Sequence, residues 1–107
     1  MAHTAIVDAE RVATLAKALA HPARVEIVEL LATQSECRGS DVFAELPLAQ
    51  STVSEHLRVL KDAGIIHASR VGTSMVYCLH YGALDELAAA TAALSGTATD
   101  MTRECGS

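Results

Sequence analysis

The chain has 107 residues and a formal net charge of −5, and half of its residues are hydrophobic. This length accommodates one domain and leaves no room for a second core. No apolar stretch approaches the ~20 residues that a membrane span needs, and no secretory signal is visible at the start, so we expect a cytoplasmic protein without membrane association. There is no tryptophan, one phenylalanine and two tyrosines, which indicates a core of Ala, Leu and Val and favours helices.

The charge is unevenly distributed. Residues 48–80 carry three basic and two acidic side chains, whereas residues 1–47 and residues 81–107 each have a net charge of −3. An acidic total counts against a protein that binds DNA, but residues 48–80 form a segment that is not acidic. Any DNA binding is therefore expected in this segment. Its non-specific affinity should be weak and steeply dependent on salt, and a dimer should be needed for useful binding.

Two helices are expected in the first third of the chain. The first covers residues 8–20 with Asp8 as its N-cap, and the second begins at Pro22, which suits a first turn, and extends to about Thr33. The apolar stripe of the second helix is too wide for a surface helix, so this helix should be central. The apolar positions are Val12, Leu15, Ala16 and Leu19 in the first helix and Val25, Ile27, Val28, Leu30 and Leu31 in the second.

A connector at residues 36–39 is followed by a short third helix at residues 40–46, capped by Ser40 and ended by Pro47. The run 48–64 then predicts the most distinctive helix of the chain. Its apolar residues Val53, Leu57 and Leu60 lie on one face, small hydroxyls and an amide stand at its start, and Gly64 ends it. Such a helix suits a DNA major groove, and equally an ordinary surface helix with a solvated face.

Residues 65–79 predict a β-hairpin. Two short β-branched runs, 65–71 and 75–79, flank the turn residues 72–74, and Tyr81-Gly82 is expected to close the hairpin. A last helix follows at residues 83–95, with apolar positions Leu84, Leu87, Ala88, Thr91 and Leu94. A groove-reading helix followed directly by a hairpin is the arrangement of a winged helix-turn-helix domain, here residues 8–95, with residues 1–7 and 96–107 as flexible tails.

Three blocks of this sequence resemble the ArsR/SmtB family of dimeric bacterial repressors: Ala18–Arg24, Leu48–Leu57 and Leu60–Ile65. The resemblance covers roughly residues 8–95. It implies a mainly α homodimer with a small β-hairpin wing: two helices, a short strand, two further helices, the hairpin and a last helix. In that family the first and last helices form the dimer interface. In this chain the Ala-rich segment 88–93 would allow the helices of the two subunits to approach closely. Two recognition helices about one DNA turn apart then read a palindrome.

The resemblance also implies which residues meet double-stranded operator DNA. Gln50 is suited to a bidentate contact with adenine, while Ser51 and Thr52 could equally hold a phosphate at the helix N-terminus. For His56 the alternative is a packed structural histidine. Ala49 replaces a frequent serine, so the helix cap is weaker or moves to Ser51. The implied DNA-binding set is Gln50, Ser51, Thr52, Ser54, His56, Arg58 and Lys61 on the helix, with Arg70, Thr73 and Ser74 on the wing.

The three cysteines are the candidate sensor. Cys37 in the connector and Cys78 in the outgoing wing strand are expected to be cross-strand neighbours, and Cys105 lies in the tail. An odd number of cysteines in a cytosolic chain argues against a structural disulfide framework. Three thiolates would suit arsenite or antimonite as inducer, the ligand the resemblance implies; zinc, with His80 or His67 as a fourth ligand, fits less well. The family's closely spaced arsenic-binding cysteines are reduced here to Cys37, and its last-helix zinc pattern is absent.

Several alternatives remain open at this point. The thiols could serve a redox- or sulfide-responsive repressor, or Cys78 could simply fill space with no metal bound. A winged helix that binds proteins and has no DNA function is also compatible with the acidic total. No nucleophile elbow, paired acid–base carboxylates or phosphate loop is present, so we do not expect an enzyme. The expected mechanism is that an inducer favours a dimer geometry in which the recognition helices no longer match the half-site spacing of the operator.

Overall fold

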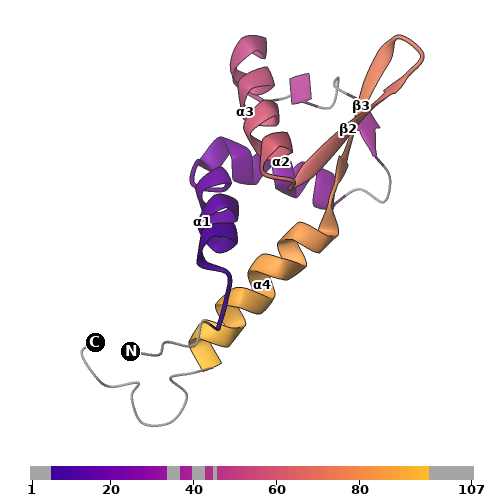
Figure 1. Cartoon of the computed structure of the whole chain (residues 1–107). Coiled ribbons are helices and arrows are strands. Elements are labelled where there is room, and N and C mark those ends of the chain that lie inside the picture. The colour runs from indigo at the N-terminus through magenta and orange to yellow at the C-terminus, as the bar shows by residue number, and fades with distance from the viewer. Residues whose placement is uncertain (1–5, 34–36, 40–42, 45, 97–107) are drawn as a thin grey trace.

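The computed structural model describes residues 6–33, 37–39, 43–44 and 46–96. In this part of the chain, the structure contains four helices and a three-stranded antiparallel sheet (Figure 1). The helices α2 and α3 pack against the sheet, and α1 packs against α4. A hairpin projects at one end, and α4 extends from the other end. This is the winged helix-turn-helix architecture predicted above, with a core small enough to be a single unit.

The first two helices begin where their capping residues predict. Helix α1 covers Ala9–Ala18, and the Asp8 side chain accepts a hydrogen bond from the Arg11 backbone N–H at 3.2 Å. Helix α2 covers Pro22–Ala32, and Nδ1 of His21 accepts from the Ala23 backbone N–H at 3.1 Å. Side-chain oxygen or nitrogen atoms at these positions satisfy amides that have no partner within the helix.

The core lies where α1, α2, α3 and the sheet meet. Helix α2 is central as predicted, since Ile27 is fully buried, but Val25 is 47% exposed, so the predicted apolar stripe was one residue too wide. Aliphatic residues make up almost all of this core, as the composition indicates. Its members are Leu15, Ala18, Ile27, Val28, Leu31, Phe43, Val53, Leu57, Leu60, Ala63, Ile65, Ile66, Leu79 and Ala83.

The connector after α2 forms a short strand, β1 at Arg38–Gly39, which pairs antiparallel with β3. Of the predicted third helix, Phe43 and Ala44 form a single 3₁₀ turn, while residues 40–42 and 45 lie outside the described part. Phe43 is buried and meets the Tyr77 ring edge-on at a centroid distance of 5.6 Å. One aromatic contact therefore anchors this segment to the wing.

Helix α3 covers Gln50–Asp62 and is the predicted recognition helix. Ala49 is its N-cap residue and makes no side-chain capping bond, which agrees with the expectation of a weaker cap. At the other end, Gly64 has φ +83°, the left-handed conformation that glycine adopts at little cost. The chain can therefore reverse at once into the sheet.

The wing consists of β2 at Ile66–Val71 and β3 at Ser74–Leu79, in the sheet order β1-β3-β2. Val71 pairs with Ser74, so the loop is only Gly72 and Thr73, with Gly72 at φ +64°. A two-residue loop of this kind favours a positive φ at its first position. The hairpin prediction is confirmed, with Ser74 in the strand rather than in the turn.

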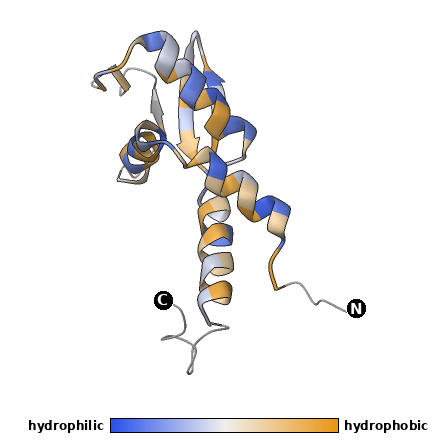
Figure 2. Ribbon diagram, turned by 90° about the vertical axis from the view of Figure 1, so that its left-hand side faces the viewer, coloured by the Kyte–Doolittle hydropathy of each residue, from blue (hydrophilic) through white to orange (hydrophobic). Residues whose placement is uncertain are grey.

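Helix α4 covers Tyr81–Gly96. Tyr81 and Gly82 therefore begin this helix, and the expectation that they close the hairpin was wrong. A Cβ atom on Gly82 would lie 2.9 Å from Nε2 of His80, so the missing side chain lets the helix begin directly beside the His80 ring. Figure 2 shows α4 largely in pale to hydrophobic colours along its length. None of the helices in the described residues is long and apolar enough to cross a membrane.

Candidate nucleic-acid interface

One side of α3 is polar and exposed. Its other side, formed by Val53, Leu57 and Leu60, is buried in the core, so the amphipathic pattern holds the helix in one rotational position. The exposed side chains include the predicted Gln50, Ser51, Thr52, Ser54, Arg58 and Lys61. Because the apolar face is fixed inward, these side chains are presented outward together.

The tip of the wing extends this polar surface. Arg70, Thr73 and Ser74, the wing residues predicted to contact DNA, are exposed. A cleft of about 620 Å³ lies between the wing and α3, with Gln50 and Ser54 on one wall and Thr73 and Ser74 on the other. Of the residues predicted to contact DNA, Gln50, Ser54, Thr73 and Ser74 thus line one cleft. We call the exposed residues of α3, together with Arg70, Thr73 and Ser74, the reading surface.

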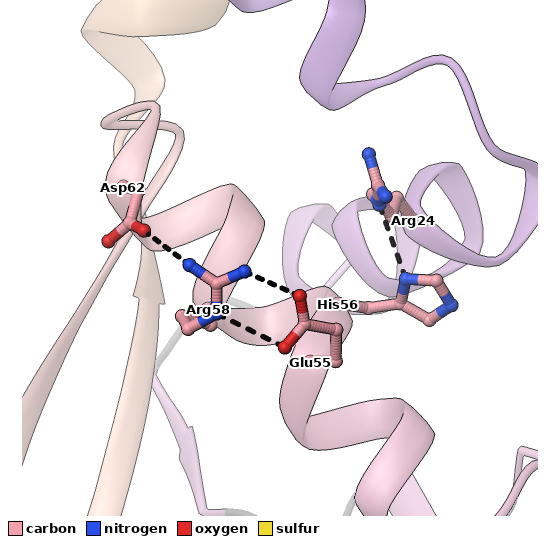
Figure 3. Close-up of polar contacts among 5 residues, drawn as sticks. All are labelled: Arg24, Glu55, His56, Arg58 and Asp62. Carbon is pink, nitrogen blue, oxygen red and sulfur yellow. Dashed lines mark hydrogen bonds and ion pairs between the residues drawn. The ribbon is translucent and has the colours of Figure 1, made fainter.

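Arg58 does not stand free on the reading surface. Its Nη1 donates to Asp62 at 2.9 Å and its Nε donates to Glu55 at 3.1 Å, with a second contact from Nη2 to the same carboxylate (Figure 3). The bidentate hydrogen bond from Arg58 lowers the pKa of Glu55, and the same bond raises the pKa of Arg58. Any phosphate that binds Arg58 must therefore compete with two carboxylates.

Glu55 was not among the residues predicted for the site. The signal was nevertheless present, since acidic and basic residues three or four positions apart on a helix lie on one face. A carboxylate on a recognition helix can also accept a hydrogen bond from the amino group of cytosine. Glu55 therefore belongs to the reading surface, where it is hydrogen-bonded to Arg58.

His56 lies on the buried side of α3. Only 6% of it is exposed, and its Nδ1 accepts a hydrogen bond from Nε of Arg24 at 3.2 Å (Figure 3). The His21 ring lies 4.5 Å away. Burial lowers the pKa of His56, and the charges of His21 and Arg24 lower it further. The geometry corresponds to the packed structural histidine, so we leave His56 out of the reading surface.

Cys37 and Cys78 are adjacent, as the strand pairing predicted. Their Cα atoms are 4.5 Å apart and their sulfur atoms form a disulfide, which corrects the expectation that the chain has none. The cause is the β1–β3 pairing, which brings together two residues 41 positions apart in sequence. Cys37 is exposed and Cys78 is half-buried, so the bond is accessible from solvent.

The predicted three-thiolate metal site is not assembled in the described residues. Sulfur atoms joined in a disulfide are not thiolates, and Cys105 lies outside the described part. His67 pairs across the hairpin with Cys78, and its ring lies 6.4 Å from that of His80. Even so, no group of three or more His, Cys, Asp or Glu side chains within the described ranges is arranged to hold a metal ion.

Comparison with known proteins shows that this chain is similar in sequence to transcriptional regulators. The sequence model of the family described as "Bacterial regulatory protein, arsR family" matches residues 21–68, from the start of α2 into β2. The HTH-type transcriptional regulator Rv0081 of Mycobacterium tuberculosis is 38% identical over 73 residues, which cover 68% of this chain and 64% of that protein. This chain thus spans less than two thirds of that relative's length. The regulator MJ1325 of Methanocaldococcus jannaschii is 38% identical over 68 residues, covering 64% of this chain and 76% of that one.

A solved structure agrees with these sequence matches. The homodimeric winged helix-turn-helix domain of Mb0332 from Mycobacterium bovis, a possible ArsR-family regulator, superposes with a TM-score of 0.61 at 30% identity. The match covers 92% of this chain and 90% of that one. The similarity therefore extends beyond the helix-turn-helix to the flanking helices.

Proposed function

Because the chain belongs to the ArsR family of bacterial regulatory proteins, we propose that it is a transcriptional repressor that binds operator DNA as a homodimer. The observation that carries this proposal is the reading surface, where the polar side of α3 and the wing tip border one cleft. Amide and hydroxyl groups suit base edges and phosphates, and Lys61 supplies charge to the DNA backbone. A regulator of this kind acts where the chromosome lies, which supports the cytoplasm as its location.

The test is a binding titration with the DNA upstream of the chain's own gene, followed by fluorescence anisotropy at several salt concentrations. Lys61→Ala should weaken binding and reduce the salt slope by about one. Lys17→Ala removes the same charge from an exposed position of α1, a helix that contributes no residue to the reading surface, and should leave the affinity and the salt slope unchanged. Absence of binding by the unmodified chain would refute the repressor and favour a winged helix that binds proteins.

The dimer is supported by the exposed apolar surface of α1 and α4. Only Ala83 and Ala90 of α4 are buried, although the helix is rich in alanine and leucine. A shallow cleft of about 220 Å³ between the start of α1 and α4 is lined by Ile6, Val12, Ala89 and Ala93, among others. Two copies of such a surface can pack closely about a two-fold axis.

Mutation of this surface tests the dimer. Ala89→Glu places a charge on the proposed interface and should shift the chain to a monomer in light-scattering measurements coupled to size exclusion. Ala32→Glu, at an exposed position of α2, provides the matched control and should stay dimeric. A monomeric unmodified chain would overturn this part of the proposal.

We further propose that the Cys37–Cys78 pair is the sensor. The inducer is arsenite or antimonite bound by the reduced thiols, with Cys105 as third ligand, or else an oxidant that converts the pair to the disulfide. The bonded pair seen here favours the oxidant, because cytosolic disulfides are commonly transient and redox-sensing. Oxidation removes two protons and two electrons from the thiols and passes the electrons to an oxidant such as diamide. The bond joins Cys37, directly before β1, to Cys78 on β3, the strand whose residues Met75 and Tyr77 line the cleft against α3. We therefore expect oxidation to change the position of the wing relative to α3 and release DNA.

Measuring the release of operator DNA in the presence of each inducer distinguishes the two mechanisms. Diamide should release the unmodified chain from DNA and dithiothreitol should restore binding, while Cys37→Ser should bind DNA and ignore diamide. Under an arsenic mechanism, arsenite should instead release the reduced chain, and Cys105→Ser should abolish that response. If Cys37→Ser fails to bind DNA under every condition, the pair is structural and the sensor proposal is wrong.

A further inference from the structure

We propose that Arg11 is a positioning residue that sets the orientation of the recognition helix α3 relative to the dimer helix α4. This inference rests on the proposed function, because it concerns how that function's two surfaces are held together. Figure 1 shows α1, which carries Arg11, between α3 and α4. The geometry points to a mechanical link from the dimer surface to the reading surface.

Arg11 contacts both helices with one guanidinium. Its Nε donates to the two carboxylate oxygens of Glu86 on α4, at 3.2 and 3.1 Å. Its Nη1 donates to the backbone carbonyl of Ala63 at 3.1 Å. Ala63 is the C-cap residue of α3, and it lies 52 positions from Arg11 in the sequence. Two segments far apart in the chain are thus joined through one side chain.

Arg11 contacts Ala63 at the C-terminal end of α3, where a cation stabilises a helix. The last carbonyls of a helix have no partner within the helix, and the negative end of the helix dipole lies there. Gly64, next along the chain, has φ +83°, and a Cβ at that position would lie 3.7 Å from Nη2 of Arg11. The guanidinium therefore caps α3 where the backbone turns away from it.

A lysine could not make both contacts equally well. Arginine presents donors in a fixed planar fork, so Nε and Nη1 reach two acceptors in different directions at once. The Arg11 side chain is 32% exposed and that of Glu86 is 48% exposed, so the ion pair alone would be weak in water. Its value lies in the geometry that the two-sided contact imposes on α3 and α4.

This geometry matters because a dimer reads two half-sites at once. The distance and angle between the two recognition helices must match half-sites about one helical turn apart. If Arg11 holds α3 at a defined angle to α4, then its loss should leave a single half-site readable but should weaken the preference for the correct spacing. Mutations at coupling residues can change such energies by amounts that correspond to about twofold to thirtyfold in affinity.

The experiment compares three duplexes: a single half-site, the palindromic operator, and the same operator with three base pairs inserted between its halves. Arg11→Ala should weaken operator binding about threefold to tenfold, change half-site binding less than twofold, and reduce the preference for the natural spacing. Arg11→Lys should restore part of this preference, and Lys17→Ala on the same helix should change nothing. Combining Arg11→Ala with Glu86→Gln should add little to the first mutation.

A second readout does not depend on DNA. Nitroxide labels attached at Lys61→Cys, in a chain that keeps the Cys37–Cys78 disulfide and carries Cys105→Ser, report the distance between the recognition helices of a dimer by pulsed electron paramagnetic resonance. Arg11→Ala should broaden this distance distribution. An unchanged distribution, an equal loss of half-site and operator affinity, or dissociation to monomers would each overturn the inference. The unmodified chain could instead fail to bind DNA while its distance distribution is narrow and broadens in Arg11→Ala. That result would refute the proposed repressor function and support the positioning role of Arg11.

Discussion

Arg24 on α2 donates a hydrogen bond from Nε to Nδ1 of His56 on α3, at 3.2 Å. The same guanidinium also reaches the carbonyl groups of Lys17 and Ala18 at the end of α1, at 3.4 Å each. Three helices thus meet at one side chain on the inner side of the recognition helix. Since Nδ1 must be unprotonated to accept this bond, the packing of α3 depends on a neutral imidazole.

Stability should therefore fall when His56 is protonated. The pKa of His56 in the fold lies below its ordinary value of 6.5, so the unfolded chain binds the proton more readily than the folded one. The stabilisation is fully present above about pH 6.5 and is lost as the pH falls toward the lower, folded pKa. Besides burial, the charges of His21 and Arg24 lower the pKa of His56, and the charge of Glu55 raises it. The free energy of unfolding, measured by urea titration, should be lower at pH 5.5 than at pH 7.5.

His56→Asn tests whether His56 causes this pH dependence, because the amide oxygen of asparagine can replace Nδ1 as the acceptor and does not titrate. The variant should show a smaller difference between the two pH values than the unmodified chain. His67→Asn alters an exposed histidine on the wing and serves as the control. If both variants keep the full pH dependence, the titration of His56 does not govern stability in this range.

Glu55→Gln should strengthen non-specific DNA binding. The change removes one negative charge from the reading surface and one of the two carboxylates that hold Arg58. The freed guanidinium can then pair with a phosphate, so affinity for a random duplex should rise severalfold at low salt and the salt slope should steepen by up to about one. Glu29→Gln makes the same charge change on the exposed side of α2, and equal effects of the two would contradict the prediction.

Reduction of the Cys37–Cys78 disulfide should destabilise the fold. The bond closes a loop between residues 41 positions apart, for which chain-entropy arguments give a loss of up to about 4 kcal/mol in the free energy of unfolding. Thermal or urea unfolding with and without a reductant measures this loss. Cys37→Ser should match the reduced chain and no longer respond to reductant, whereas a Cys105→Ser chain that loses the response would contradict the pairing.

Gly64→Ala should cost about 1 to 2 kcal/mol of stability. An alanine at φ +83° is strained by its Cβ, although the nearest atoms, from Arg11, are at ordinary contact distance. A Cβ added at Gly96, near the end of α4, would meet no atom within 4 Å outside its own stretch of helix, and its φ is not positive. Gly96→Ala should therefore be close to neutral. Equal effects in urea unfolding would show that backbone conformation is not the cause.

Local features of the fold were predictable from short stretches of sequence. The Asp8 cap, the proline at the start of α2, the amphipathic α3 and the hairpin each depend on residues within a few positions of one another. The Glu55–Arg58 pair, three residues apart on a helix, is of the same local kind and could have been predicted. The start of α4 was placed two residues late, because Tyr81 and Gly82 read as turn residues when the neighbouring His80 ring is not considered.

The sequence by itself determined the amphipathic α3, the hairpin and the polar residues that both expose, since these follow from periodicity and turn chemistry, and three short blocks of residues indicated the family by resemblance. Only the tertiary structure decided that His56 faces inward to Arg24, that Cys37 and Cys78 are bonded, and that Arg11 joins Glu86 to the end of α3. These contacts join residues 32 to 75 positions apart. Their formation depends on how the helices and strands pack, which no short stretch of sequence encodes.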